Sequence, residues 1–254
     1  MKITTKILST AVFTVLSLGV NASDDSHHLN QLYQENCASC HGADHGGYLA
    51  PALNADTLKG RSPTALRSII MTGSFDTLMP PFYGKLSDDD IRGLVKHLQS
   101  TPKQPNPAWT LEDMKKSVQV YIQDESTLPS KPTYDIDSMD NIIGVAARGK
   151  YGRGAGSKAV FINSATHKEI GEVPTGTAAH IIEFNPANPR WAYVKTDTAE
   201  IFKIDLYSMK AVRSIKTGMN GPGIGISRDG KYIMAGSFVP HNAVILNADT
   251  LEPL

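Results

Sequence analysis

The segment Cys37-Ala38-Ser39-Cys40-His41 constrains this chain more than any other, because it contains both cysteines of the 254 residues. Two thiols separated by two residues can form two thioether links to a haem, and the histidine that follows can bind its iron. A redox disulfide would need a βαβ setting and a zinc site would need a second, matching ligand pair, and the sequence has neither. We therefore expect one covalent haem c at Cys37, Cys40 and His41.

The first 22 residues have the pattern of an exported protein. Lys2 and Lys6 precede an apolar stretch from Ile7 to Val20, and Val20-Asn21-Ala22 fits a small-residue cleavage site. An uncleaved membrane anchor is the less favoured alternative, because a span needs ~20 apolar residues. Covalent haem attachment follows export in bacteria, so we expect a signal peptide over residues 1–22 and a periplasmic location.

The charge balance of the chain points to no particular partner. Its 25 basic and 25 acidic residues lack the basic excess that is typical of nucleic-acid-binding proteins, so nucleic acid is not expected as a partner. Hydrophobic residues make up 41% of the chain and charged residues 20%, the balance of a soluble globular protein. The length allows two domains of ordinary size.

Three helices are expected in residues 24–100, each from apolar side chains spaced three and four apart. The first reaches His41, the second lies between its cap Ser62 and Gly73, and the third begins at Ser87. The apolar positions are Leu29, Leu32 and Tyr33 in the first helix, Leu66, Ile69 and Ile70 in the second, and Ile91, Leu94, Val95 and Leu98 in the third. Three helices around one flat cofactor predict a small all-α domain.

Met79 is the expected sixth ligand of the iron. It lies in the loop 77–82, where two prolines restrict the backbone and would hold the sulfur at a fixed point. Met71 is the rival, although its place near the end of a helix suits core packing. The carbonyl of Pro51 could fix the ring of His41 from behind. The other histidines near the motif, His27, His28, His45 and His97, are expected on the solvated surface or a helix surface rather than on iron.

Residues 101–140 are expected to connect two domains and to lie against both. Three prolines fall within residues 101–108, and Thr110 with Asp113 can cap a short helix. Two further prolines and an acidic stretch follow, which favour an extended connector.

From residue 141 onward the sequence repeats with a period of 42 residues. Ile162-Asn163, Ile204-Asp205 and Leu246-Asn247 follow one another at this step. Each unit contains alternating apolar residues and polar turns, and about 42 residues in four strands is the size of one propeller blade. Residues 141–254 hold about two and a half such blades, whereas a closed propeller has about four to eight. We therefore expect a truncated sequence, the alternative being a small open β domain covered by the haem domain.

These segments together resemble two known domains. NCASCHGADHGG, LMPPFYG and LSDDDIRGLVKHLQS resemble a class I cytochrome c over residues 24–100. VPTGTAAHIIEFNP, IDLYSMKAVRSIKTG and SFVPHNAVILNADTLEPL resemble the propeller of the cytochrome cd1 family, which includes the nitrite reductase and the dehydrogenase that completes haem d1. The resemblance implies a multidomain fold, a small all-α domain followed by all-β propeller repeats. It implies His41 and Met79 as axial ligands of haem c, and His180 as an axial ligand of haem d1.

The chain departs from this resemblance at the positions where the family has arginines that pair with the carboxylates of haem d1. Lys195-Thr196-Asp197-Thr198 stands at one of these places and Pro222 near the other, which leaves Arg148 and Arg153 as candidate contacts. The distal histidines of the family belong to later blades.

Two functions stay open. The first is an oxidoreductase of the cytochrome cd1 class that passes electrons between haem c and haem d1, in the reduction of nitrite to nitric oxide or in the oxidation of dihydro-haem d1. The second is an electron carrier whose β domain docks a partner and binds no second haem. The expected partners are a periplasmic electron donor or acceptor protein, nitrite or a haem d1 precursor, and a second copy of the chain in a homodimer.

Overall fold

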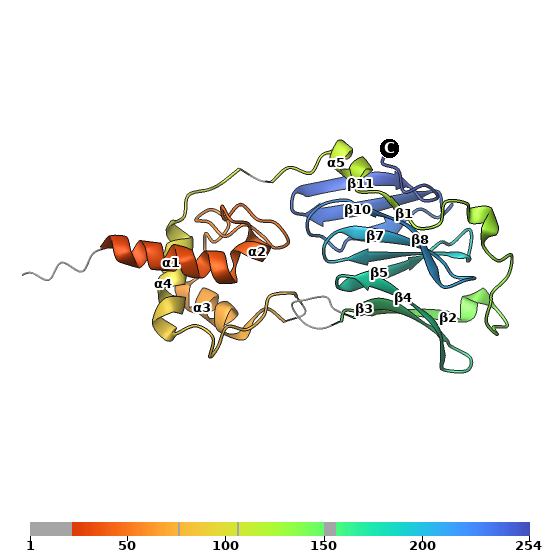
Figure 1. The fold of residues 1–254 in the computed structure, drawn as a ribbon, viewed down its shortest axis with the longest axis horizontal. Coiled ribbons are helices and arrows are strands. Elements are labelled where there is room, and N and C mark those ends of the chain that lie inside the picture. The colour runs from red at the N-terminus through yellow and green to blue at the C-terminus, as the bar shows by residue number, and fades with distance from the viewer. Residues whose placement is uncertain (1–21, 76, 106, 150–155) are drawn as a thin grey trace, which may run out of the picture.

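The computed structural model describes residues 22–75, 77–105, 107–149 and 156–254. Residues 1–21 of the expected signal peptide and the candidate contact Arg153 lie outside these ranges. A helical domain lies beside a β domain, on the left and right of Figure 1. In the part of the chain that is described, no helix combines the length and the apolar character needed to cross a membrane.

The helical domain confirms the three expected helices and divides the first of them at Cys37. Its helices are α1 (Ala22–Asn36), α2 (Ala38–His41), α3 (Pro63–Thr72) and α4 (Asp88–Ser100). The hydroxyl of Ser62 accepts a hydrogen bond from the backbone of Ala65 at the start of α3, and Gly73 ends that helix. Ser87 and Asp90 form a capping box at the start of α4. Local sequence signals therefore set the helix ends.

One apolar cluster holds these helices together. Its buried members are Tyr33, Leu58, Leu66, Leu94, Val95 and Leu98. Tyr33 of α1 is fully buried, and its hydroxyl donates to the carbonyl oxygen of Gly42 over 2.6 Å. This bond ties the segment directly after His41 to the core of the domain.

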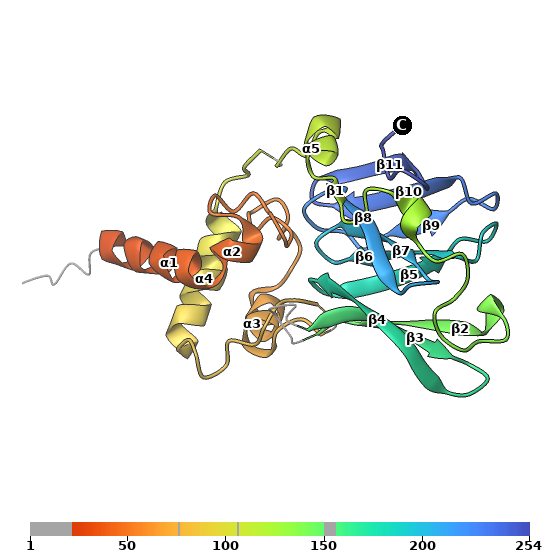
Figure 2. The same ribbon diagram turned by 45° about the vertical axis from the view of Figure 1, so that its right-hand side comes forward.

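The β domain is a stack of three antiparallel sheets, which Figure 2 shows from the side. The strands are β1 (Gln119–Val120), β2 (Ile142–Ala147), β3 (Ser157–Asn163), β4 (Lys168–Gly176), β5 (Ala179–Phe184), β6 (Trp191–Thr196), β7 (Glu200–Asp205), β8 (Lys210–Lys216), β9 (Ile224–Ile226), β10 (Tyr232–Phe238) and β11 (His241–Asn247). Their order is β2-β3-β4 in the first sheet, β1-β8-β7-β6-β5 in the second and β11-β10-β9 in the third.

The 42-residue period of the sequence appears as equivalent strands in the three sheets. β3, β7 and β11 end at Asn163, Asp205 and Asn247, and each is followed by a turn. One apolar layer, which includes Phe161 and Phe202, joins the first and second sheets, and another joins the second and third. The described residues form part of a propeller, and their sheets do not close into a ring.

The segment expected to connect the domains packs largely against the β domain. It contains α5 (Leu111–Lys116), the 3₁₀ helices η1 (Glu125–Thr127) and η2 (Met139–Asn141), and strand β1. β1 pairs with β8 and extends the second sheet. Met114 of α5 is buried in the apolar layer between the second and third sheets. The extended connector that the prolines favoured is thus partly replaced by elements that cover the sheets.

Candidate haem-binding sites

The two cysteines and the histidine of the motif are brought together by a tight helical turn. Cys37 lies between α1 and α2, and its carbonyl oxygen accepts the amide of His41 over 2.9 Å. Both thiols are free and partly buried. Burial, followed by the nearby Cys40, raises the pKa of Cys37 to about 11. The two cysteines thus lie on one turn, the arrangement that thioether attachment requires.

His41 is held from behind as expected, because its Nδ1 lies 2.7 Å from the carbonyl oxygen of Pro51. A proton assigned to Nδ1 in this hydrogen bond leaves Nε2 as the free acceptor that can bind iron. Burial lowers the pKa of His41, which favours the neutral, metal-binding imidazole. The predicted contact between His41 and Pro51 is present.

The loop that carries Met79 is fastened to the end of α3. Ser74 donates its amide to the carbonyl of Met79 over 3.3 Å, and Phe82 donates to the carbonyl of Ile70 over 3.1 Å. Gly73 has φ +74°, and a Cβ there would lie 2.7 Å from the carbonyl oxygen of Met79, so only glycine fits this approach. Met79 is partly buried. Two thiols, one imidazole and a thioether on a fixed loop are a donor set that fits a haem c.

His45 differs from its expected place on the solvated surface. The residue is 7% exposed, and its ring stacks on the ring of Tyr33, with 3.6 Å between the centroids. The loop from Gly42 to Gly47 turns inward, and His45 adopts φ +64° within it. The stacking contact favours this buried position, so the expected solvent exposure of His45 was wrong. His28, in contrast, is exposed and pairs with Asp90 over 2.8 Å.

A second candidate site forms around His180 in the β domain. His180 lies in β5, and Asp197 directly follows β6. His180 Nδ1 lies 3.0 Å from Asp197 Oδ1 and 2.7 Å from Arg148 Nη1, while Arg148 also forms an ion pair with Asp197. All three side chains are partly buried. Nδ1 thus faces both a group that can only donate, the guanidinium of Arg148, and an acceptor, the carboxylate of Asp197. When the proton is placed on Nδ1 and donated to Asp197, Nε2 of His180 is the acceptor that can bind a metal.

His180 and Arg148 were predicted from the sequence as site residues, whereas Asp197 was given no role. Asp197 was named only as part of the segment 195–198, which departs from the family pattern, so the sequence contained little indication of a role for it. Its amide donates to the carbonyl of Ala178 over 3.0 Å, which fixes the carboxylate beside β5. Asp197 is therefore the residue that orients the candidate ligand His180.

Lys195, which stands where the family has an arginine, does not face a carboxylate. Its side chain is fully buried, and Nζ lies 3.0 Å from the carbonyl oxygen of Gly223 and 2.8 Å from that of Gly236. Burial lowers the pKa of Lys195 from 10.5 to about 7. Lys195 thus joins the second sheet to the third. The described residues fit the axial imidazole of a haem d1 and supply one guanidinium, Arg148, which Asp197 already pairs.

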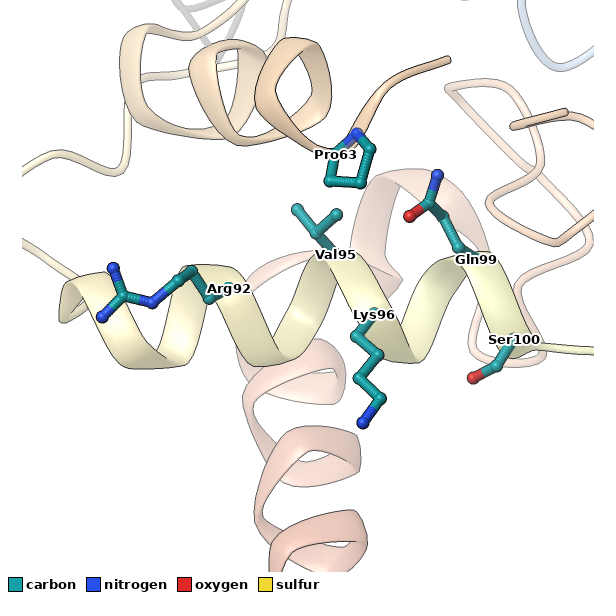
Figure 3. Close-up of a pocket in the computed structure, with 6 residues that line it drawn as sticks. All are labelled: Pro63, Arg92, Val95, Lys96, Gln99 and Ser100. Carbon is teal, nitrogen blue, oxygen red and sulfur yellow. The ribbon is translucent and has the colours of Figure 1, made fainter. Parts of the chain in front are cut away.

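A shallow hollow of about 280 Å³ lies along α4 (Figure 3). It is lined by Pro63, Arg92, Val95, Lys96, Gln99 and Ser100. None of these side chains is a thiol, an imidazole or a thioether, so the hollow takes no part in the haem sites.

Comparisons with known proteins assign the two domains separately. The family model of cytochrome C oxidase, cbb3-type, subunit III matches residues 24–98, and that of the cytochrome D1 heme domain matches residues 151–254. Dihydro-heme d1 dehydrogenase of Pseudomonas aeruginosa is 30% identical over 222 residues, which cover 87% of this chain and 43% of the relative. Nitrite reductase of Stutzerimonas stutzeri is 26% identical over 243 residues, which cover 88% of this chain and 41% of the relative. The solved structure of dihydro-heme d1 dehydrogenase NirN in complex with DHE has a TM-score of 0.63 at 28% identity, covering 88% of this chain and 46% of that one.

The chain therefore joins a c-type cytochrome domain to part of a D1-type propeller. It is homologous to dihydro-heme d1 dehydrogenase over most of its own length. The chain spans less than half the length of the curated relatives it matches.

Proposed function

We propose that the chain is an exported, periplasmic protein that passes electrons between a haem c in its helical domain and a d1-type macrocycle bound at its β domain. One observation carries the proposal: each candidate iron-binding histidine has an oxygen atom within hydrogen-bond distance of Nδ1, and donation of an Nδ1 proton to that oxygen leaves Nε2 as the metal-binding atom. Pro51 supplies the oxygen for His41, and Asp197 supplies it for His180. Such partners orient a ligating imidazole and raise its basicity.

In the helical domain, the residues of this chain hold and tune the cofactor. Cys37 and Cys40 provide the attachment points, and His41 and Met79 provide the axial ligands. The haem supplies a one-electron iron couple, and a thioether ligand raises its potential. The anchored loop keeps the sulfur of Met79 at one place, so that little reorganisation accompanies electron transfer.

The oxidation of dihydro-haem d1 is the reaction that we favour. The identity to the dehydrogenase, 30%, exceeds the identity to the nitrite reductase, 26%, and supports an outward flow of electrons from the macrocycle. This dehydrogenation removes two electrons and two protons, whereas one c-type iron accepts one electron. Each turnover therefore reduces two oxidised haem c equivalents, and a periplasmic acceptor protein reoxidises them.

A spectral titration tests the proposal. The chain carrying haem c is mixed with haem d1, and the visible spectrum is compared with that of His180→Ala. We expect an additional band in the red region for the unsubstituted chain and its loss in the variant. A spectrum that contains only the bands of haem c would exclude a d1 site at His180.

The second candidate function is an electron carrier that binds no second haem. This function is favoured because the two cationic side chains in question already have protein partners. Arg148 is paired with Asp197, and Lys195 is bound to backbone carbonyls. Neither is free of protein partners to meet the carboxylates of a macrocycle. In this case the β domain serves only to dock the redox partner, and the titration with haem d1 leaves the spectrum unchanged.

A further inference from the structure

The two domains are joined at a small contact between a loop of the helical domain and a segment of the β domain. The side-chain amide of Asn220 donates to the backbone carbonyl of Leu49. Beside it, Nζ of Lys216 lies 5.9 Å from the centre of the Tyr48 ring, within range of a cation–π contact. These residues come from distant parts of the sequence, so the contact depends on how the domains dock.

On the helical side, the contact reaches the candidate ligand of haem c through few bonds. The amide of Ala50 donates to the carbonyl of Cys40 over 2.8 Å, and the amide of Tyr48 donates to the carbonyl of Ala50 over 3.0 Å. The next residue, Pro51, holds Nδ1 of His41. A displacement of Leu49 is therefore transmitted to the carbonyl that orients His41.

On the β side, the same contact leads to the carboxylate that orients His180. The carbonyl of Asn220 accepts the amide of Phe238 over 2.7 Å, which fixes its backbone on β10. The amide of the following Gly221 donates to the carbonyl of Asp197 over 3.0 Å. A Cβ at Gly221 would lie 2.4 Å from the Cα of Ser237, so this segment has little freedom to move.

We propose that Asn220 is a positioning residue that couples the positions of the two candidate ligands, His41 and His180. It fastens the loop behind His41 to the segment behind Asp197 and His180, and thereby holds the two sites in one arrangement. The inference rests on the proposed function, because it takes His41 and His180 as the iron ligands. Asn220 itself contacts neither imidazole.

The test uses the full chain carrying haem c and compares Asn220→Ala with Asn220→Gln and Asn242→Ala. Asn242 is the matched control, since its amide lies 3.4 Å from the carbonyl of Thr217 within the β domain. Hydrogen exchange is measured for residues 42–53 and 195–221, and the reduction potential of the haem is measured by titration. Haem content is checked first in every sample, so that a failure of haem attachment is seen separately.

We expect Asn220→Ala to increase exchange in both segments by about twofold to tenfold, the factor that corresponds to the loss of one hydrogen bond. Its haem potential should fall, because a looser loop at Pro51 admits water to the iron site. Asn220→Gln, which keeps the donor, should restore both values, and Asn242→Ala should match the unsubstituted chain. Exchange and potential that stay unchanged in Asn220→Ala, or that change equally in Asn242→Ala, would overturn the proposal.

Discussion

At the scale of single residues, each candidate site has a histidine whose Nδ1 lies beside an oxygen atom, and the two oxygen atoms come from different kinds of group. His41 is oriented by a backbone carbonyl and His180 by a carboxylate. The first contact joins positions ten residues apart and could be predicted from the sequence. The second joins a residue of β5 to one that directly follows β6, and because many side chains share such a spacing, only the fold identifies Asp197 as the partner.

The carboxylate of Asp197 should determine how tightly His180 binds a metal-containing macrocycle. Replacing Asp197 with asparagine removes the charged acceptor and weakens the hold on the imidazole, so affinity for haem d1 should fall by about 10- to 100-fold. A spectral titration measures this change. Asp229→Asn, at an exposed turn, serves as the control and should bind as the unsubstituted chain does. Equal affinities for Asp197→Asn and the control would show that Asp197 has no role in binding haem d1.

The buried ammonium of Lys195 should make stability depend on pH in one direction. Burial lowers the pKa of Lys195 to about 7 in the folded chain, whereas the unfolded chain keeps a value near 10.5. Between these values the unfolded state binds more protons, so the free energy of unfolding should rise with pH relative to Lys195→Met. Below about pH 7 the full cost of burying the charge is present in the unsubstituted chain.

Urea denaturation at pH 7, 8.5 and 10 would measure the effect of Lys195 for both proteins. The difference in unfolding free energy between Lys195→Met and the unsubstituted chain should shrink with rising pH. Parallel pH profiles would show that Lys195 keeps an ordinary pKa in the folded state.

At the scale of secondary-structure elements, the helix ends follow local sequence rules closely. Ser62 with Gly73 and Ser87 with Asp90 mark the ends that the structure shows. β1 was not predicted, because two residues that pair with β8 leave no periodic pattern in the sequence. Its position depends on the tertiary packing of Met114 and its neighbours against the sheets.

The capping box of α4 should contribute measurably to the stability of the helical domain. Ser87→Ala removes the hydroxyl that accepts the amide of Asp90, which should lower the unfolding free energy by about 1 kcal/mol. Chemical denaturation followed through the haem spectrum measures the loss. Ser68→Ala, on the exposed part of α3, is the control and should cost nothing. An equal loss in both variants would mean that the capping box has no special role.

At the scale of the whole molecule, the sheet stack has an apolar face at each end. Ile143 and Val145 of the first sheet are 50% and 42% exposed, and Met234 and Ile245 of the third are 56% and 44% exposed. Ile201 and Lys203 of the second sheet stand 42 residues before Ala243 and Ile245, and both are buried. Ile201 packs in the apolar layer between the second and third sheets. The 42-residue period predicted the stacking of sheets, but it could not predict how the helical domain docks, because that contact depends on single residues such as Asn220.

The central claim is that electrons pass between a macrocycle held at His180 and the haem c at His41. Its most direct test mixes the chain carrying oxidised haem c with dihydro-haem d1 under anaerobic conditions and follows the absorption of reduced haem c by stopped flow. We predict that two equivalents of haem c are reduced per dihydro-haem d1, and that His180→Ala slows this reduction by at least about tenfold, the range seen when a metal site loses a ligand partner. Haem c that stays oxidised, or that is reduced at the same rate in His180→Ala, would contradict the account.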